Sequence, residues 1–326
     1  MTPSPEPVLT FEAMLDNLKR APNWQHLPDI RVAMWPSQVR FADDLSDATL
    51  FNDRYMESRA FVGKMAFALY LTCGAFLATA IFSVIAITCD MLTSRDWREI
   101  VSLNWMLTLF SILMFFLAYG LFKLEPICVR FNRQAQLVHI YQRPGEAMTS
   151  LWREVHPFTK FSPSGEGQLS LKLIFRTSPT DLAMAPGAFD LGDESALVDN
   201  LTRLEFLRRY MAEGLSAIQP DPQRTANLPS GFTRSVTFKD DGLINFLLTK
   251  LVVLPAYYLA GGPLIDRYLL RRAANLQWPA EVEQLCSPGA DLSGYDTTPV
   301  QAHPDIFYRF TGRGFDLVDI HGNVLG

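Results

Sequence analysis

Two uncharged apolar runs near the start of the chain, Met65–Cys89 and Ile100–Phe122, constrain its fold more than any other feature. As helices that rise about 1.5 Å per residue, both are long enough to cross a hydrocarbon core of about 30 Å with some tilt. Neither run contains a charge or a proline, and charged residues flank both of them. The pattern predicts a transmembrane helical hairpin, with a pair of buried core helices as the alternative.

Lysine and arginine near the runs set the expected orientation, because basic residues are retained on the cytoplasmic side of a membrane. Basic residues gather before the first run and after the second, whereas the connector between the runs balances its arginines with acidic residues. The flanking basic residues are Arg54, Arg59, Lys64, Lys123, Arg130 and Arg133. We expect a multi-pass membrane protein with both termini in the cytoplasm.

Charge and cysteine usage narrow the classes of site and partner. The formal net charge is −5, which gives no support for nucleic-acid binding, because nucleic-acid-binding domains carry a basic face. The cysteines lack the close CxxC spacing of a zinc site or a disulfide framework, and we expect each to pack as a small apolar side chain. They are Cys73, Cys89, Cys128 and Cys286.

After the second run, apolar side chains recur with a period of two, which is typical of β-strands. Turn-forming residues separate these strand candidates. The economical interpretation is a meander of antiparallel strands that needs a helix or a second sheet to cover its apolar face. The expected strands are Ile127–Phe131, Leu137–Tyr141, Leu151–Phe158 and Gln168–Phe175.

A covering helix is predicted over residues 195–213, where apolar side chains recur at helical spacing. Asp193 or Ser195 can cap its start, and Gly214 can end it in a left-handed conformation. Three basic residues of this helix are Arg203, Arg208 and Arg209. A solvated basic face is favoured for them, and contact with anionic headgroups or with a partner's carboxylates is the alternative.

A third apolar stretch, Leu243–Ile265, is interrupted by Lys250 and Pro255 and is followed by arginines. A lysine inside a span costs about 2.5 to 3.5 kcal/mol on insertion scales, and a third crossing would place the arginines outside. A helix at the inner membrane surface, or one buried against the β-rich domain, is therefore preferred over a third span for residues 243–272.

The two ends of the chain carry weaker patterns. We expect a short helix near Thr10–Arg20 behind a proline-rich tip, and a charged, helix-compatible segment at Asp43–Arg59 that leads into the first span. The last residues predict a β-hairpin from Ile306–Phe310 and Phe315–His321, which either completes the main sheet or forms a small addition to it.

Together these elements predict an α+β membrane protein, in which a transmembrane helical hairpin carries a cytoplasmic antiparallel β-rich domain with a covering helix. The expected parts are an N-terminal cytoplasmic segment, the hairpin, the β-rich domain, an interfacial or buried apolar helix, and a C-terminal loop with a β-hairpin. Their boundaries are 1–64, 65–122, 123–242, 243–272 and 273–326.

No catalytic motif accompanies this architecture. The chain lacks a GxSxG elbow, a phosphate-binding GxxxxGK[ST] loop, an HExxH pair and a run of metal ligands. His139 and His156 fall on strands expected in one sheet, where ordinary strand histidines are favoured over a functional pair. We therefore expect no enzyme activity, no cofactor and no metal.

Three stretches of the chain resemble an uncharacterised bacterial family of two-span proteins. They are Val129–Arg133 with Leu137–Tyr141, Trp152, and Leu204–Met211 with Gly214. Members of that family carry a similar "FNR…LVH" strand pair and an "EFIRRYM" helix, and many are encoded beside type VI secretion effectors. This chain departs from the pattern at Leu204 and Leu207, where the family has Trp and Ile. The resemblance, over about residues 45 to 265, implies a protein of the bacterial inner membrane. It also implies that this protein acts as an immunity protein, which neutralises a type VI secretion toxin, such as a pore-forming one, by direct binding.

An immunity protein against a membrane-acting toxin needs a helix-binding face in the bilayer, and small residues allow close approach of helices. Small and polar residues occur along both runs, although packing of the hairpin against itself is the favoured explanation for them. They are Gly74, Ala75, Ala78, Thr79, Ser83 and Ser111. The candidate partner-binding residues are thus Arg203, Arg208, Arg209, Gly74 and Ala78.

Two other functions stay open. One is a membrane-anchored scaffold or signalling module, whose β-rich domain, related to pleckstrin-homology barrels, binds a protein or a lipid headgroup. The other, an enzyme, is least favoured, because it would need a cleft with clustered and perturbed ionisable groups. The expected partners are a cognate toxin and membrane lipids.

Overall fold

The computed structural model describes residues 10–41, 45, 47–58, 61–92, 97–123, 128–162, 168–178, 181–186, 197–219, 247, 250–251 and 254–325. Contacts divide the chain into two compact units. Unit 1 comprises Met1–Ala60, Ile127–Leu228 and Gln277–Gly326, and unit 2 comprises Phe61–Pro126 and Pro229–Leu276. The mixed α+β class predicted from the sequence is confirmed, because the described residues form both helices and three β-sheets.

The first sheet of unit 1 is a four-stranded antiparallel meander in the order β3–β4–β5–β6. Its strands are β3 (Tyr55–Ser58), β4 (Val129–Asn132), β5 (Leu137–Arg143) and β6 (Glu146–Leu151). The predicted strand pair at Ile127–Phe131 and Leu137–Tyr141 is confirmed by β4 and β5. Ser58 of β3 lies opposite Val129 of β4, so the chain leaves this sheet for unit 2 and re-enters it at the neighbouring strand.

The second sheet has the order β1–β7–β8–β9. Its strands are β1 (Trp24–His26), β7 (His156–Ser162), β8 (Gln168–Ser178) and β9 (Asp181–Pro186). The strand predicted at Gln168–Phe175 is confirmed, but the strand predicted over Leu151–Phe158 is wrong, because the 3₁₀ turn η2 (Trp152–Glu154) separates β6 from β7. The Trp152 ring is fully buried against Phe131. The turn that contains Trp152 thus lies between the last strand of the first sheet and β7 of the second.

The third sheet joins the two ends of unit 1. It has the order β11–β10–β2, with β2 (Ala33–Met34) parallel to β10 (Ile306–Phe310) and β10 antiparallel to β11 (Phe315–Asp319). The predicted C-terminal hairpin is therefore confirmed. It does not complete the meander, since it pairs with a short N-terminal strand that the sequence pattern did not indicate.

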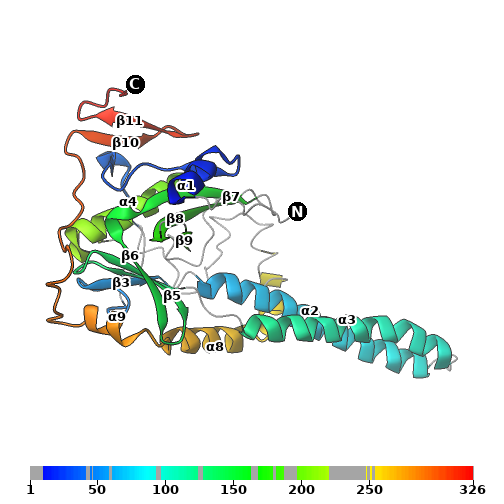
Figure 1. The fold of residues 1–326 in the computed structure, drawn as a ribbon. Helices are drawn as coiled ribbons and strands as arrows, with labels where there is room; N and C mark the ends of the chain where they lie inside the picture. The colour runs from blue at the N-terminus through cyan, green and yellow to red at the C-terminus, as the bar shows by residue number, and fades with distance from the viewer. Residues whose placement is uncertain are drawn as a thin grey trace, which may run out of the picture. The chain divides into compact units, whose positions relative to one another are not determined.

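Helix α4 (Leu197–Glu213) confirms the predicted covering helix and packs against β8, β7 and β2 (Figure 1). Its apolar side chains, with those of all three sheets, form the main core of unit 1. After α4 the chain turns at Gly214, whose φ is 96°, and the 3₁₀ turn η3 (Leu215–Ile218) follows. A short helix, α9 (Ala280–Leu285), lies in the C-terminal part of the same unit.

The N-terminal residues belong to this core. Helix α1 (Phe11–Arg20) confirms the predicted short helix, with the Thr10 hydroxyl accepting a hydrogen bond from the Ala13 amide at 3.3 Å. Between α1 and β3 lie the 3₁₀ turn η1 (Pro36–Gln38) and buried apolar side chains of the main core. The prediction of a helix-compatible segment at Asp43–Arg59 is wrong at β3. There the Asn52 side chain accepts hydrogen bonds from the amides of Arg54 and Tyr55, which forms a turn before the strand.

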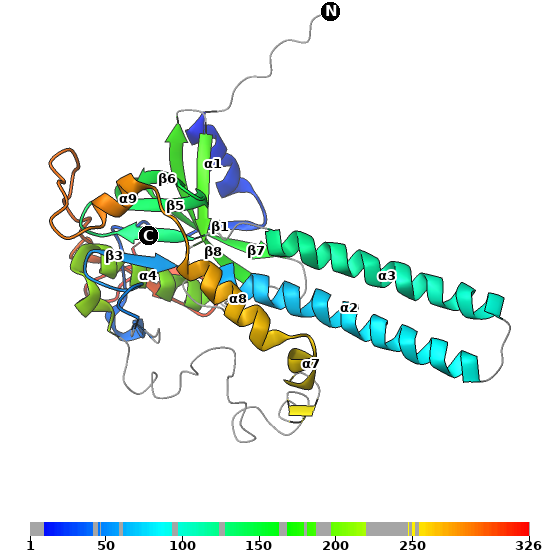
Figure 2. The same cartoon turned by 90° about the horizontal axis from the view of Figure 1, so that it is seen from below.

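Unit 2 contains the two predicted apolar helices, α2 (Phe61–Leu92) and α3 (Trp97–Lys123), packed side by side (Figure 2). Within the described residues, one helix is long and apolar enough to cross a membrane, α2 over Ala68–Cys89, and 12% of that window is buried. In α3 the apolar stretch is Leu109–Lys123, which is shorter than a membrane span requires.

The third apolar stretch does not form one continuous helix. Its described part contains α7 (Leu254–Leu259) and α8 (Gly262–Ala274), separated by a turn at Gly261. Several expectations concern residues outside the described ones. They are the proline-rich tip, the acidic residues 43–44, the connector residues 93–96, the turn at 163–167 and the caps at Asp193 or Ser195.

Candidate functional site

Two of the candidate arginines of α4, Arg208 and Arg209, form ion pairs with a glutamate of the same helix. The Glu205 carboxylate, fully buried, accepts hydrogen bonds from Arg208 Nε at 2.7 Å, from Arg209 Nε at 2.7 Å and from the Met34 amide at 3.1 Å. Arg208 is 4% exposed, so a solvated basic face is wrong for this residue. Arg203 and Arg209 are partly exposed. The buried carboxylate therefore joins α4 to β2, and the positive charges of Arg208 and Arg209 balance its negative charge.

The candidate small residues of α2 differ in their surroundings. A Cβ added at Gly74 would lie 3.5 Å from Ala260 Cβ, an ordinary contact, whereas Ala78 is exposed. Between α2 and α3, the Ser111 hydroxyl donates to the Thr79 hydroxyl at 2.8 Å. Thr79 and Ser111 thus join the two helices of the hairpin to each other.

A row of polar side chains crosses the whole meander. Glu57 lies opposite Arg130, Arg130 opposite His139, and His139 opposite Thr149. Residues that face one another across paired strands project to the same side of a sheet. The opposite side carries apolar residues of the main core, so this sheet is apolar on one face and carries a polar row on the other.

Arg130 is the centre of this row, and it is 5% exposed. Its guanidinium donates to Glu57 Oε2 from Nη2 at 2.8 Å and from Nε at 3.1 Å, and to Glu283 Oε1 at 3.1 Å. The same group lies over two aromatic rings, 4.5 Å from the centroid of Tyr55 and 4.6 Å from that of Trp278. Charge-assisted hydrogen bonds and cation–π contacts both strengthen away from water.

The C-terminal segment around α9 covers the row. The indole of Trp278 donates to Glu57 Oε2 at 3.1 Å, and the Asn132 side chain donates to the Leu285 carbonyl at 3.0 Å. The Leu285 side chain packs in a small apolar cluster with Leu137 of β5. The polar row and the segment around α9 that covers it thus fasten the C-terminal part of the chain to the meander. We call this contact region, which includes Glu57, Arg130 and Trp278, the clamp.

Cys286 lies in the same clamp, where burial raises the pKa of its thiol to about 11. The thiolate, and not the thiol, is the nucleophilic form of cysteine. Cys286 is thus neutral at physiological pH, and its side chain is 2% exposed. The predicted role as a small buried side chain is confirmed for Cys128 and Cys286, but it is wrong for Cys89, which is exposed on α2.

His139 is fully buried in the clamp. Its Nδ1 atom is 2.8 Å from the Thr149 hydroxyl, and its Nε2 atom has no hydrogen-bond partner among the residues that the structure describes. Burial, together with the charge of Arg130, lowers the pKa of His139 to about 3. His156 lies on β7 in the second sheet, so the predicted placement of the two histidines on one sheet is wrong.

The neutral state of His139 makes unit 1 sensitive to acid. Because the folded pKa is below the usual value of about 6.5, the unfolded chain binds the proton first, and stability is lost as the pH falls from 6.5 towards 3. One such group changes the free energy of unfolding by up to about 1.4 kcal/mol per pH unit in that window. Urea unfolding at pH 7, 6, 5 and 4 measures this loss.

His139→Gln is the matched control for that measurement, because glutamine retains a polar group beside Thr149 and does not titrate. The pKa values of His26 and His156 are also lowered by burial, and both residues remain in the variant. We expect the wild-type protein to lose more stability than His139→Gln over the same range. Parallel curves for the two proteins would contradict the assignment.

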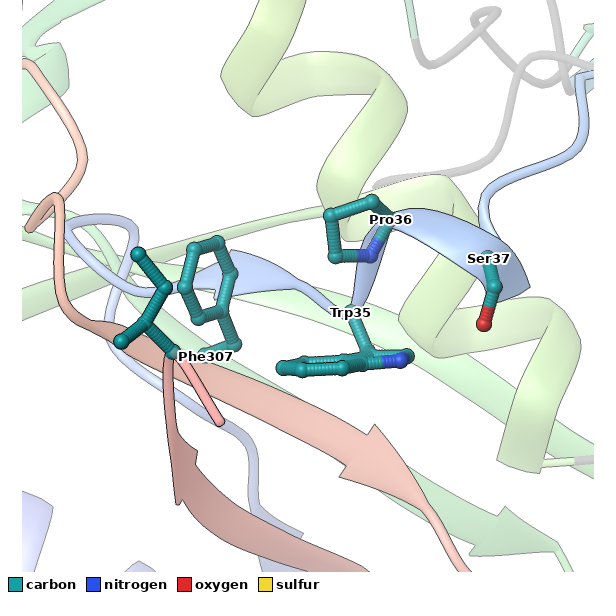
Figure 3. A pocket seen from close by; sticks show the side chains of 5 residues that line it. Trp35, Pro36, Ser37 and Phe307 are labelled. Carbon is teal, nitrogen blue, oxygen red and sulfur yellow. The ribbon is translucent and has the colours of Figure 1, made fainter. Parts of the chain in front are cut away.

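An apolar pocket of about 340 Å³ lies on the surface of unit 1, lined by Trp35, Pro36, Ser37, Phe307 and Ile320 (Figure 3). The rings of Trp35 and Phe307 meet edge to face, with 5.6 Å between their centroids. Ile320 is 56% exposed at the end of β11. Aromatic and aliphatic groups at a surface are typical of protein-binding sites.

Among the residues that the structure describes, no three His, Cys, Asp or Glu side chains gather as metal ligands would. Comparison of the chain with known protein families, with curated proteins and with solved structures gives no significant match.

Sequence reasoning missed both the clamp and the apolar pocket. Glu57 and Arg130 lie on either side of the hairpin in the sequence, and Trp278 is farther still. Alternation of charged and apolar residues in Tyr55–Ser58 and Val129–Asn132 was the available signal for two neighbouring strands. The pocket joins residues from both ends of the chain, and no local pattern indicates such a contact.

Proposed function

We propose that this protein is a membrane-anchored binding protein of a bacterial inner membrane, in which α2 and α3 cross the bilayer as a hairpin and both termini face the cytoplasm. The observation that carries the proposal is the surface of α2. Only 12% of its apolar window over Ala68–Cys89 is buried, and Phe82 and Val84 in this window are 66% and 63% exposed. Water is a poor environment for such a surface, whereas lipid is a good one. On α3, apolar residues such as Phe116, 63% exposed, also point outward.

Unit 1 is the binding domain in this proposal, and its strand order supports a pleckstrin-homology-like barrel. The four-stranded meander β3–β6 is followed in the chain by the three consecutive strands β7, β8 and β9 and then by helix α4. Such barrels are built from two packed antiparallel sheets and a C-terminal helix. In this chain the membrane hairpin interrupts the barrel between its first two strands.

The resemblance described above suggests the kind of partner, a toxin delivered by type VI secretion. Neutralisation by binding needs no turnover, and the exposed residue Ala78 on α2 offers a place where a toxin helix approaches closely. The protein is then an immunity protein that meets its toxin in the bilayer.

Co-expression with the product of the neighbouring gene tests this function. The tagged protein is purified from native membranes, and growth of a sensitive host is scored in parallel. We expect a stable complex and rescue of growth with the wild-type protein. We expect Ala78→Phe to lose both, because the larger ring blocks close helix approach.

Val84→Phe is the matched control, since Val84 is 63% exposed on α2 and lies on a different side of the helix, six residues from Ala78. This variant should bind and protect like the wild-type protein. Equal behaviour of the two variants would remove Ala78 from the interface, and absence of both binding and rescue in the wild type would contradict immunity.

The apolar pocket favours a second candidate, a membrane-anchored scaffold. Its lining of Trp35, Phe307 and Ile320 suits an apolar side chain of a cytoplasmic protein. The same purification distinguishes the two functions. Recovery of a cytoplasmic protein in place of the neighbouring gene product, without protection of the host, supports the scaffold.

A further inference from the structure

Helices α7 and α8 of unit 2 meet at a tight corner that glycine makes possible. Gly261 has a φ of 75°, which favours glycine. A Cβ added to Gly262 would lie 2.1 Å from the ring of Tyr257, and Pro263 follows in the first turn of α8. The chain thus comes along α7, turns at residues 260–262 and continues along α8.

The corner lies beside the apolar window of α2. Ile265 and Leu269 of α8 are buried against Leu69 of α2, and Ala260 at the corner contacts the position of Gly74. As residue numbers rise along α2, the contacting residue numbers fall along α8, so the two helices run in opposite directions. Gly74 is six residues beyond Ala68, where the apolar window of α2 begins, which at about 1.5 Å per residue is about 9 Å.

A shared carboxylate fixes this register. The Asp266 side chain accepts hydrogen bonds from the hydroxyls of Tyr70 and Tyr257, the latter at 2.5 Å. Polar groups at membrane depth are tolerated where other protein groups satisfy them. The two tyrosines therefore allow an acidic residue of α8 to lie along the apolar helix α2.

The other end of α8 lies at the last turn of α3. Arg272 Nη1 donates to the Phe122 carbonyl at 2.7 Å, and the ring of Tyr268 meets that of Phe122 edge to face. The last carbonyls of a helix lack partners within the helix, and a cation near them is favourable. In the proposed orientation, this is the cytoplasmic end of α3.

The outward surface of α7 and α8 changes from apolar to basic between these two ends. At the corner, Leu259 is 65% exposed and Leu264 is 70% exposed. Towards the C-terminal end of α8, the exposed residues include Arg267 and Arg271. An apolar end beside the bilayer window and a basic end beside the cytoplasmic boundary match the layers of a membrane leaflet.

We propose that α7 and α8 form a re-entrant elbow that enters the cytoplasmic leaflet and returns to the same side. Leu259 and Leu264 contact lipid acyl chains, and Arg267 and Arg271 contact headgroup phosphates. The depth of about 9 Å at Gly74 stays within one leaflet of a core about 30 Å thick. The elbow rests on the proposed placement of α2 and α3 in the bilayer, and in it α7 and α8 do not cross the membrane.

Site-directed spin labelling in vesicles of phosphatidylethanolamine and phosphatidylglycerol tests the elbow. Cys73 and Cys89 are replaced by alanine, while Cys128 and Cys286, both buried, are retained. Single cysteines then replace Leu264, Arg271, Leu113 or Arg143. Collision rates with oxygen, which concentrates in lipid, and with a water-soluble nickel chelate report the surroundings of each label.

We expect Leu264→Cys to match Leu113→Cys, an outward position of α3 that is 58% exposed, with a high ratio of oxygen to nickel collisions. Arg271→Cys should give an intermediate ratio. Arg143→Cys, on the exposed end of β5, should give a low one.

Each other outcome overturns the elbow and identifies what failed. A nickel-accessible label at Leu264 with a lipid-exposed label at Leu113 rejects the elbow and leaves the hairpin in the membrane. Nickel access at both positions rejects the membrane placement as well. A Leu264 label that collides with neither reagent shows that protein, and not lipid, covers the corner.

Discussion

Replacing Arg130 with alanine is expected to lower the free energy of unfolding by about 3 to 5 kcal/mol, the cost of leaving one member of a buried ion pair without its partner. Glu57 is 4% exposed, and in the variant its carboxylate retains the indole of Trp278 as a donor. The stacking of Arg130 on Tyr55 and Trp278 is lost in addition. Urea unfolding in detergent, followed by circular dichroism, measures the change.

Arg143→Ala is the matched control, since Arg143 lies on β5 of the same sheet and pairs with Glu146 at 2.6 Å in an exposed position. Exposed ion pairs contribute little because water screens them, so the midpoint should stay close to that of the wild type. Similar midpoints for Arg130→Ala and Arg143→Ala would show that the clamp does not stabilise the fold.

Glu205→Gln is expected to destabilise unit 1 by a comparable amount, about 3 to 5 kcal/mol. The substitution keeps the shape of the side chain but removes the charge that faces Arg208 Nε at 2.7 Å and Arg209 Nε at 2.7 Å. The Arg208 guanidinium then stays buried without its carboxylate. Urea unfolding under the same conditions measures the loss.

Glu213→Gln makes the same chemical change in the same helix. Its carboxylate is 51% exposed and lies 4.0 Å from Arg208, so we expect nearly wild-type stability. If Glu205→Gln instead left stability unchanged while abolishing partner recovery, the arginines of α4 would belong to a binding surface, as the sequence suggested, and not to the core.

Local periodicity was sufficient to predict much of unit 1. The strands at β4, β5 and β8, the helix α4 and the C-terminal hairpin all follow from alternation or helical spacing of apolar residues. The prediction failed at Leu151–Phe158, because Trp152 extends an apolar pattern while its burial forces a turn. Pattern alone does not distinguish a strand from an anchored turn.

Long-range pairing was beyond local patterns. β2 pairs with β10, and β1 with β7, although a large part of the chain separates each pair. Short strands of two or three residues carry almost no periodicity of their own, and their position is decided by the neighbours that pair with them. The sequence pattern of the N-terminal segment therefore does not indicate that Leu27, Ile30 and Met34 contribute to the main core.

The candidate site residues show the same limit. The general exposure of arginine in proteins favours an outward position for Arg208 and Arg209, but Glu205, on the adjacent turn, gives them a buried partner. Conversely, the clamp and the pocket each combine residues from distant parts of the sequence, so neither was visible without the fold.

The pairing of β3 with β4 has a consequence for synthesis of the protein. A ribosome delivers β3 first, then α2 and α3, and only afterwards β4, so the first sheet cannot be completed before the hairpin has been made. Leu69 near the start of α2 packs in one cluster with Leu121 near the end of α3, so the finished hairpin brings its own ends together and lowers the entropy cost of joining the flanking strands. Under the proposed membrane placement of α2 and α3, completion of the first sheet waits for insertion, and a chain that missed the membrane would retain unpaired strand edges, the usual target of cellular quality control.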